Sequence, residues 1–149
     1  MRVTTSDGAF GFVIERTDAP RFFVFQLVIG GELTGDRDPC ILGTAMHQIK
    51  YLDALDIDPV LVARMDAPEI IAALRSRDSW NDRSLRPLAE SLDLWWVRGF
   101  ICGTDVVFIA GQGSVEGEGP QRIAKVPIED YDPIAGAVVD FWTAASAPA

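Results

Sequence analysis

The sequence predicts an α+β domain, in which helices pack on one face of a mostly antiparallel β-sheet. Aromatic and β-branched runs separated by glycine-containing turns occur in both halves of the chain, which is typical of hairpins. Between these runs the apolar residues change to helical spacing, and a further helical stripe ends the chain. The expected order of elements is therefore ββ–αα–βββ–α. A chain of 149 residues is most simply one domain, residues 1–149, which would bury roughly 68–70% of its unfolded surface.

The first hairpin is predicted from residues 9–16 and 22–29. Both segments are rich in Phe, Val and Ile, which suit a pleated and largely buried surface. Residues 17–20, Thr-Asp-Ala-Pro, form the expected turn between them. Gly30 and Gly31 follow the second strand and permit positive φ, so the chain is expected to reverse there.

Two helices are predicted in the middle of the chain. The first is an amphipathic helix of about three to four turns, since apolar residues recur at spacings of three and four. They are Leu42, Ala45, Met46, Ile49, Leu52 and Leu55. The second is a short helix that Asp66 and Glu69 begin as a capping box, with Pro68 in its first turn. Residues 75–91 are polar and proline-containing and are expected to form a loop or a weak helix.

Three strands and a last helix are predicted in the second half. The strands are residues 94–101, 106–110 and 121–126, with a turn at 103–105 and a glycine-rich reversal at 111–119. Asp132 is expected to be the N-cap of the last helix, with Pro133 at its first position. An apolar stripe follows at Ile134, Ala137, Val138, Phe141 and Ala145.

Charge and composition exclude several classes of function. The formal net charge is −9, which repels nucleic-acid phosphates and anionic lipid and favours a basic protein partner. Residues 1–7 lack the apolar segment of a secretory signal, and no apolar run is long enough to cross a bilayer. Cys40 and Cys102 match no metal or redox spacing. We therefore expect a cytoplasmic protein with free thiols.

The sequence offers little that indicates catalysis or a cofactor. His47 is the only histidine, and its place off the apolar helix face predicts a solvated side chain. The acidic segments 36–38 and 56–58 lack the further oxygen ligands that a hard cation requires. The segment 111–119 departs from G-x-G-x-x-G and is not followed directly by a helix signal. No catalytic, cofactor-binding or metal-binding residue is predicted, and the protein is not expected to be an enzyme.

The four tryptophans are candidate interface anchors or core residues. Trp95 and Trp96 are neighbours in a strand, so they should face opposite sides of the sheet. Burial of both rings is the favoured interpretation, and the same holds for Trp142 on the last helix. Trp80 lies among charged residues with no core pattern, which favours it as a surface anchor.

Several segments resemble the Immunity protein 42 family of bacterial polymorphic-toxin immunity proteins. The similarity rests on the strand, Gly-Gly turn and Gly-Asp of residues 22–36, the two strands within 98–110, the Arg-Ile strand and Val-Pro corner of 122–127, and the helix of 132–142. It extends from about residue 10 to residue 142. The resemblance implies a cofactor-free cytoplasmic protein that neutralises a cognate toxin domain by covering its active or substrate-binding surface. The shared positions are core and turn residues, so no binding residue transfers.

Charge and expected exposure then select the residues of the toxin-binding surface, all in predicted loops or strand ends. They are Glu32, Asp36, Asp38, Asp56, Asp58, Trp80, Asp82, Glu116 and Glu118. The expected state is a monomer or weak homodimer. Two alternatives remain: a small-ligand-binding protein or hydrolase with a pocket between sheet and helices, and a subunit of a homo-oligomeric assembly. Buried carboxylates with shifted pKa values would favour the first, and self-association would favour the second.

Overall fold

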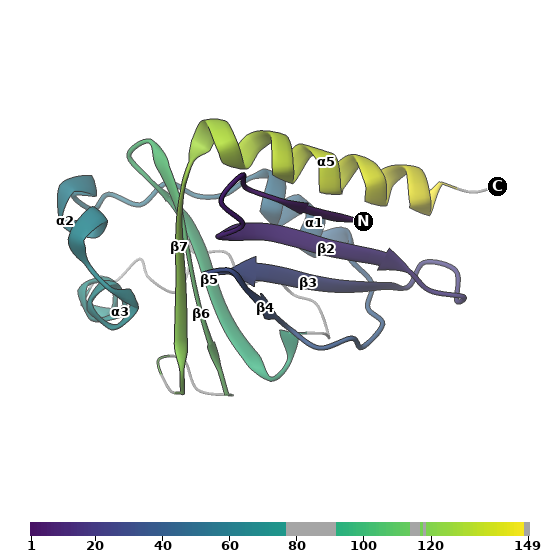
Figure 1. Cartoon of the computed structure of the whole chain (residues 1–149), viewed down its shortest axis with the longest axis horizontal. Helices are drawn as coiled ribbons and strands as arrows, with labels where there is room; N and C mark the ends of the chain where they lie inside the picture. Colours follow the sequence, from purple (N-terminus) through teal and green to yellow (C-terminus); the bar gives the residue numbers. More distant parts are fainter. Residues whose placement is uncertain (77–91, 114–116, 118, 148–149) are drawn as a thin grey trace.

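A computed structural model gives the architecture of the chain and describes residues 1–76, 92–113, 117 and 119–147 (Figure 1). All paired strands within the named elements are antiparallel, and the predicted α+β class is confirmed. In chain order the elements are β1 (Arg2–Thr4), β2 (Phe10–Arg16), β3 (Phe23–Ile29), β4 (Glu32–Thr34), α1 (Gly43–Lys50), α2 (Pro59–Arg64), α3 (Ala67–Arg75), β5 (Trp95–Cys102), β6 (Asp105–Gln112), β7 (Gln121–Pro127) and α5 (Ile128–Ser146).

The strands form two sheets, where the sequence predicted one. The first sheet has the order β1-β2-β3-β4 and the second the order β5-β6-β7. Each strand therefore pairs with its neighbours in the chain, on either side of the helices α1 to α3. Local turns determine such hairpin pairing, but they do not determine whether two groups of strands join along an edge.

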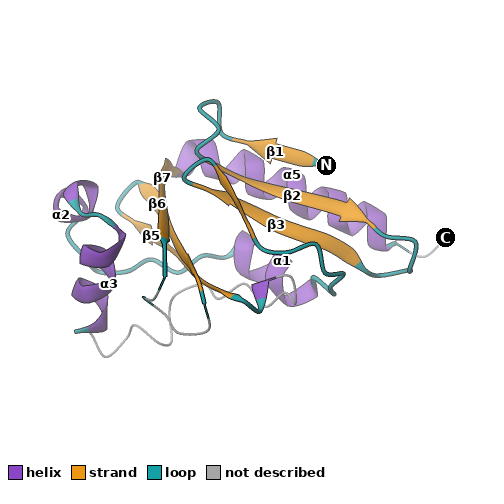
Figure 2. Ribbon diagram, turned by 60° about the horizontal axis from the view of Figure 1, so that its bottom comes forward, coloured by secondary structure: helices purple, strands orange, loops and turns teal. Residues whose placement is uncertain are grey.

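Helices α1 and α5 cover one face of the first sheet (Figure 2). Alternate residues of β2, including Phe10 and Phe12, point into this core together with alternate residues of β3. The ring of Phe10 stacks on Phe108 of the second sheet, with centroids 4.5 Å apart. The buried Tyr131 hydroxyl of α5 donates a hydrogen bond to the Ile49 carbonyl of α1 at 2.7 Å. One apolar core thus joins both sheets and both helices.

The second sheet is covered on both faces. Along β6, Val106 and Phe108 point into the core shared with the first sheet, while Val107 and Ile109 point to the opposite side. On that opposite side, α3 and Val62 of α2 complete a second apolar cluster. Figure 1 shows α2 and α3 beside the second sheet, on the side away from the first. The sequence predicted helices on a single face of one sheet. In the structure, α2 and α3 also cover the second sheet, on the face opposite the shared core.

Two local predictions are confirmed by backbone geometry. Gly30 and Gly31 have φ of 62° and 80° at the reversal between β3 and β4, where side-chain-bearing residues would be strained. At the start of α3, the Glu69 amide donates to the Asp66 carboxylate at 2.9 Å. The Asp66 amide donates in turn to the Glu69 carboxylate at 2.8 Å. This reciprocal pair is the predicted capping box.

Two predicted helix boundaries were wrong, and one helix was missed. Helix α1 ends at Lys50, so Leu52 and Leu55 lie outside it, and α2 was not predicted. Helix α5 begins at Ile128, which places Pro133 inside the helix and removes Asp132 as its N-cap. The buried residues of α5 begin with Tyr131 and continue at helical spacing. The helix starts about one and a half turns before Pro133. Because proline has no amide hydrogen, one carbonyl in the first turn lacks its usual intrahelical donor.

Candidate partner-binding surface

The predicted partner-binding residues do not form one continuous group among those that the structure describes. Glu32, Asp36 and Asp38 lie in residues 32–38, called the β4 region below. Asp56 and Asp58 lie in the α2 region, which we define as residues 53–64 with the β5–β6 turn at 103–105; the two regions occupy different parts of the fold (Figure 1). The remaining four predicted residues, Trp80, Asp82, Glu116 and Glu118, lie outside the described residues.

In the β4 region, Glu32 is an ion-pair partner within the chain. Its carboxylate lies 2.9 Å from the Arg122 guanidinium of β7. The same guanidinium donates to the Leu33 carbonyl and, at 2.9 Å, to the Thr34 hydroxyl. Its central carbon lies 4.7 Å from the centroid of the Trp95 ring. Arg122 therefore links the edge of the first sheet to the second. Glu32 takes part in this link, and the Arg122 guanidinium offsets its negative charge.

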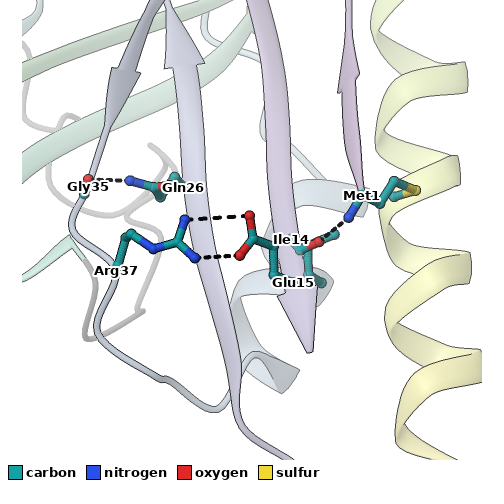
Figure 3. Close-up of polar contacts among 6 residues, drawn as sticks. All are labelled: Met1, Ile14, Glu15, Gln26, Gly35 and Arg37. Carbon is teal, nitrogen blue, oxygen red and sulfur yellow. Dashed lines mark hydrogen bonds and ion pairs between the residues drawn. The ribbon is translucent and has the colours of Figure 1, made fainter. Parts of the chain in front are cut away.

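A second arginine offsets acidic charge in the same region. Arg37 extends across β3 and pairs with Glu15 of β2, with a shortest N–O distance of 2.6 Å (Figure 3). Hydrogen bonding to Arg37 lowers the pKa of Glu15, and the same bond raises the pKa of Arg37. Gln26 of β3 donates to the Gly35 carbonyl at 2.8 Å, which fixes the chain where it leaves β4.

Asp36 and Asp38 lie on either side of Arg37 in the chain and are exposed. Neither carboxylate has an ion pair with a residue in the described ranges. Their field is nevertheless reduced locally, because the Arg37 charge lies between them in sequence. The β4 region thus combines four carboxylates with two arginines, once Glu15 and Arg122 are included.

The α2 region is built around a short helix that is fixed at both ends. At the N-terminus, the Asp58 carboxylate accepts from the Val60 amide at 2.9 Å, which makes Asp58 the N-cap. At the C-terminus, the Lys125 ammonium of β7 donates to the Ala63 carbonyl at 3.1 Å and to the Met65 carbonyl at 2.7 Å. A negative group at the N-terminus and a positive group at the C-terminus both stabilise the helix dipole.

The chain before α2 lies against the end of the second sheet. The Leu55 amide donates to the Ile101 carbonyl, and the Ile101 amide donates to the Asp53 carbonyl, both at 2.9 Å. In the β5–β6 turn, Gly103 has φ of 61°, and a Cβ there would lie 2.8 Å from the Pro59 ring. Glycine is required at this contact for both its backbone conformation and its small size.

Several carboxylates gather in the α2 region. Burial, and then the charges of Asp105 and Asp58, raise the pKa of the Cys102 thiol. Both aspartates therefore act on the same buried group, although they come from different elements. Asp53, Asp56 and Asp58 are exposed, and Asp105 is half-buried. In the part of the chain that is described, Asp53, Asp58 and Asp105 have no ion pair.

Sequence reasoning missed Asp53 and Asp105 as members of this acidic surface. Asp53 was placed in a helix that ends earlier, and Asp105 was placed in a turn without a known neighbour. The signal for α2 was present in the sequence. Asp58 followed by Pro59 is an N-cap followed by proline at the first helical position, the pattern that was used elsewhere.

The histidine, the two cysteines and Tyr131 lie outside the two acidic surfaces or beneath them. His47 is exposed, with its ring centroid 4.9 Å from that of Tyr51. Cys40 and Cys102 are buried free thiols, as predicted. Burial raises the pKa of Tyr131, whose hydroxyl stays protonated and bonded to α1. Within the described ranges, no three His, Cys, Asp or Glu side chains are grouped so that they could hold a metal ion.

Of the tryptophans that the structure describes, Trp96 is buried as the favoured interpretation expected, whereas Trp95 and Trp142 are half-buried. Trp96 is buried in the cluster under α3, and Trp95 is half-buried against the core shared by the two sheets. Their rings thus face opposite sides of the second sheet. Trp142 is half-buried against the shared core as well. All three side chains contribute to packing within the fold.

The geometry can be compared with known structures. The chain has the fold of a CdiI protein. The match is to the "Crystal structure of CdiI from Burkholderia dolosa AUO158", with a TM-score of 0.58 and 13% sequence identity. It covers 93% of this chain and 98% of the CdiI chain. At this identity the similarity establishes the fold alone.

Sequence comparison adds no family. No protein-family model matches the chain, and no curated protein sequence does. The resemblance to Immunity protein 42 is therefore not confirmed and stays a prediction. Within the described residues, no helix is both long and apolar enough to span a membrane.

Proposed function

We propose that this protein is an immunity protein that binds a cognate bacterial toxin domain and neutralises it by covering its active or substrate-binding surface. The observation that carries the proposal is the fold shared with CdiI over nearly the full length of both chains. CdiI is an immunity protein of contact-dependent inhibition. The resemblance to Immunity protein 42, reached from the sequence, points to the same kind of function.

The surface of the molecule supports binding to a basic protein. Exposed carboxylates that lack an internal ion pair are available to lysines and arginines of a partner, and the chain carries a net charge of −9. Long-range attraction of this kind increases the rate at which two proteins meet in the correct orientation. A nuclease domain, whose substrate is a polyanion, would present such a basic surface at its active site.

The proposed mechanism requires no reaction by this chain. Each of the two buried thiols donates to a backbone carbonyl, and so does the buried Tyr131 hydroxyl. His47 is exposed. Of the carboxylates with shifted pKa values in the described part of the chain, Asp7 is exposed and Glu15 is half-buried. The buried carboxylates that would favour a hydrolase are not found among those residues. We propose a cytoplasmic, cofactor-free inhibitor that is monomeric or weakly dimeric before it meets its toxin.

Co-expression tests this function. The chain should restore growth to a susceptible host that produces the toxin domain encoded beside its gene, and the two proteins should co-purify in the presence of a metal chelator. A toxin domain from an unrelated system provides the control and should not be bound. Failure to bind or to protect against the neighbouring toxin domain would contradict the proposal.

A further inference from the structure

Helix α2 presents two adjacent apolar side chains to solvent. Val60 is 60% exposed and Leu61 is 52% exposed, whereas Val62 is 3% exposed and packs against the second sheet. The helix has six residues, and one buried valine anchors its inner side. Exposed valine and leucine side chains are ordinary when scattered singly, but two adjacent ones on a fixed helix form a small apolar surface.

The position of this apolar surface is fixed before any partner arrives. Asp58 caps the N-terminus of α2 and Lys125 binds carbonyls at its C-terminal end. Pro59 also restricts the backbone at the first helical position. A helix of this length would not be stable alone, so these contacts keep it in place. Less conformational freedom is then lost when Val60 and Leu61 become buried against a partner.

Carboxylates lie beside the apolar pair. Asp58 immediately precedes the helix, and the Gly103 turn that contacts Pro59 continues into Asp105. Asp53 lies on the adjoining segment, bonded through its carbonyl to the end of β5. An apolar centre bordered by charged residues is the usual anatomy of a protein–protein interface.

Three other exposed apolar side chains lack this combination. Ile41 is 58% exposed and precedes α1, with no aspartate or glutamate within two residues of it in the sequence. Tyr51 lies under the Lys50 ammonium, which is 5.5 Å from its ring centroid. Leu33 is next to Glu32, whose charge Arg122 offsets. Among these surfaces, the α2 region joins adjacent apolar residues to carboxylates without an ion pair.

We infer that the α2 region is the toxin-contacting surface, with Val60 and Leu61 inserted into an apolar depression that lysines and arginines border. This inference rests on the proposed function and specifies the site through which it acts. Charge complementarity selects the occupant: the α2 region carries more carboxylates than cations, with Arg64 at the end of the helix, so its border repels acidic surfaces, including a second copy of this chain with its net charge of −9. The apolar pair slows dissociation, and the aspartates accelerate association.

The test measures the dissociation constant for the purified toxin domain encoded beside this gene. Leu61→Gln replaces an apolar side chain with a polar one of similar size and good helix propensity. It should weaken binding at least about thirtyfold, as expected for a central interface residue. The matched control is Ile41→Gln, the same kind of change at a comparably exposed position outside the α2 region. It should change the constant less than about threefold.

Loss of the helix is separated from loss of the contact by a second variant. Leu61→Ala removes the apolar contact while it keeps a strong helix former in α2, and it should still weaken binding about tenfold. If wild-type protein binds the toxin domain and both Leu61 variants bind as tightly, the inference is overturned and the proposed function stands. If wild-type protein does not bind, the proposed function fails and the inference fails with it.

Discussion

The β4 region and the α2 region are both acidic and exposed, but they differ in what their carboxylates contact. In the β4 region, Glu32 and Glu15 are paired with Arg122 and Arg37, and Asp36 and Asp38, which have no ion pair among the described residues, lie on either side of Arg37 in the chain. In the α2 region, the Asp58 carboxylate caps a helix, and Asp53 and Asp105 lack an ion pair with any residue that the structure describes. A net charge of −9 therefore does not indicate where a partner binds. The pairing of each carboxylate within the fold is the basis on which we distinguish the two regions.

The difference matters for attraction at a distance. The field of a carboxylate beside an arginine falls off within a few ångströms, because the two charges cancel. An unpaired carboxylate acts over about 8–10 Å at physiological ionic strength. We therefore expect the α2 region to guide a basic partner, and we expect the β4 region mainly to hold the two sheets and the neighbouring loop in place.

The largest expected effect is on the rate of association. Asp53→Lys combined with Asp58→Asn should slow association with the neighbouring toxin domain about tenfold or more at low salt, because it removes the field that orients the partner. Asp36→Lys combined with Asp38→Asn makes the same change of charge in the β4 region and should slow association less than about threefold. Stopped-flow kinetics would measure both.

Unfolding midpoints in urea must match wild type for these kinetics to be compared. Equal slowing by the two double variants would contradict the distinction between the regions. Raised salt should abolish the difference between the Asp53/Asp58 double variant and wild type, since screening removes the long-range attraction.

The next effect separates the two roles of Asp58. Asp58→Ala should lower the free energy of unfolding by about 1 kcal/mol, because it removes the N-cap of α2. Asp58→Asn keeps a capping oxygen and should retain nearly all of that stability. Both variants should slow association, since both remove the negative charge. Urea denaturation measures the first effect, and equal stability of Asp58→Ala and wild type would mean that the cap does not stabilise the fold.

A smaller effect concerns the Cys102 thiol. Its pKa is raised, first by burial and then by Asp105 and Asp58, so its reaction with Ellman's reagent should accelerate only at a higher pH than that of an unfolded thiol. In a Cys40→Ser background, Asp105→Asn should shift this pH profile part of the way back. An unchanged profile would place Asp105 too far from Cys102 to act on it.

The smallest effect is expected from the Glu15–Arg37 pair. The pKa of Glu15 is lowered from its ordinary value of 4.5 by hydrogen bonding to Arg37. Any stability from this pair is therefore fully present above that ordinary value and is lost as the pH falls through the lowered one. The slight advantage of wild type over Glu15→Gln in thermal unfolding at pH 7 should vanish near pH 2. An advantage that persists there would contradict the pairing.

The sequence predicted the longer strands well because their signals are local, but it missed the three-residue strands β1 and β4. Residues 22–29 and 106–110 carry runs of aromatic and β-branched side chains, and the glycines that end them permit only a few turns. The helix starts show the limit of this reasoning. Asp132 and Pro133 imitate a cap, yet apolar spacing from Tyr131 extends the helix upstream. Helix α2 was missed because six residues are too few for a periodic pattern.

The candidate site was less predictable because its properties depend on distant residues. The sequence shows that Glu32 and Asp58 are acidic, but it does not show that Arg122 offsets the first or that Asp105 lies near the second. Both facts follow from how the two sheets and α2 pack together. The exposure of Leu61 likewise depends on which side of a short helix faces the second sheet.

An NMR titration tests the central claim most directly. Isotope-labelled protein would be titrated with the unlabelled toxin domain encoded beside its gene, and the backbone amide shifts would be followed for the full chain. The account predicts that the largest changes fall in residues 53–64 and 103–105, with small changes in residues 32–38. The largest changes in residues 32–38, with the α2 region unaffected, would contradict it.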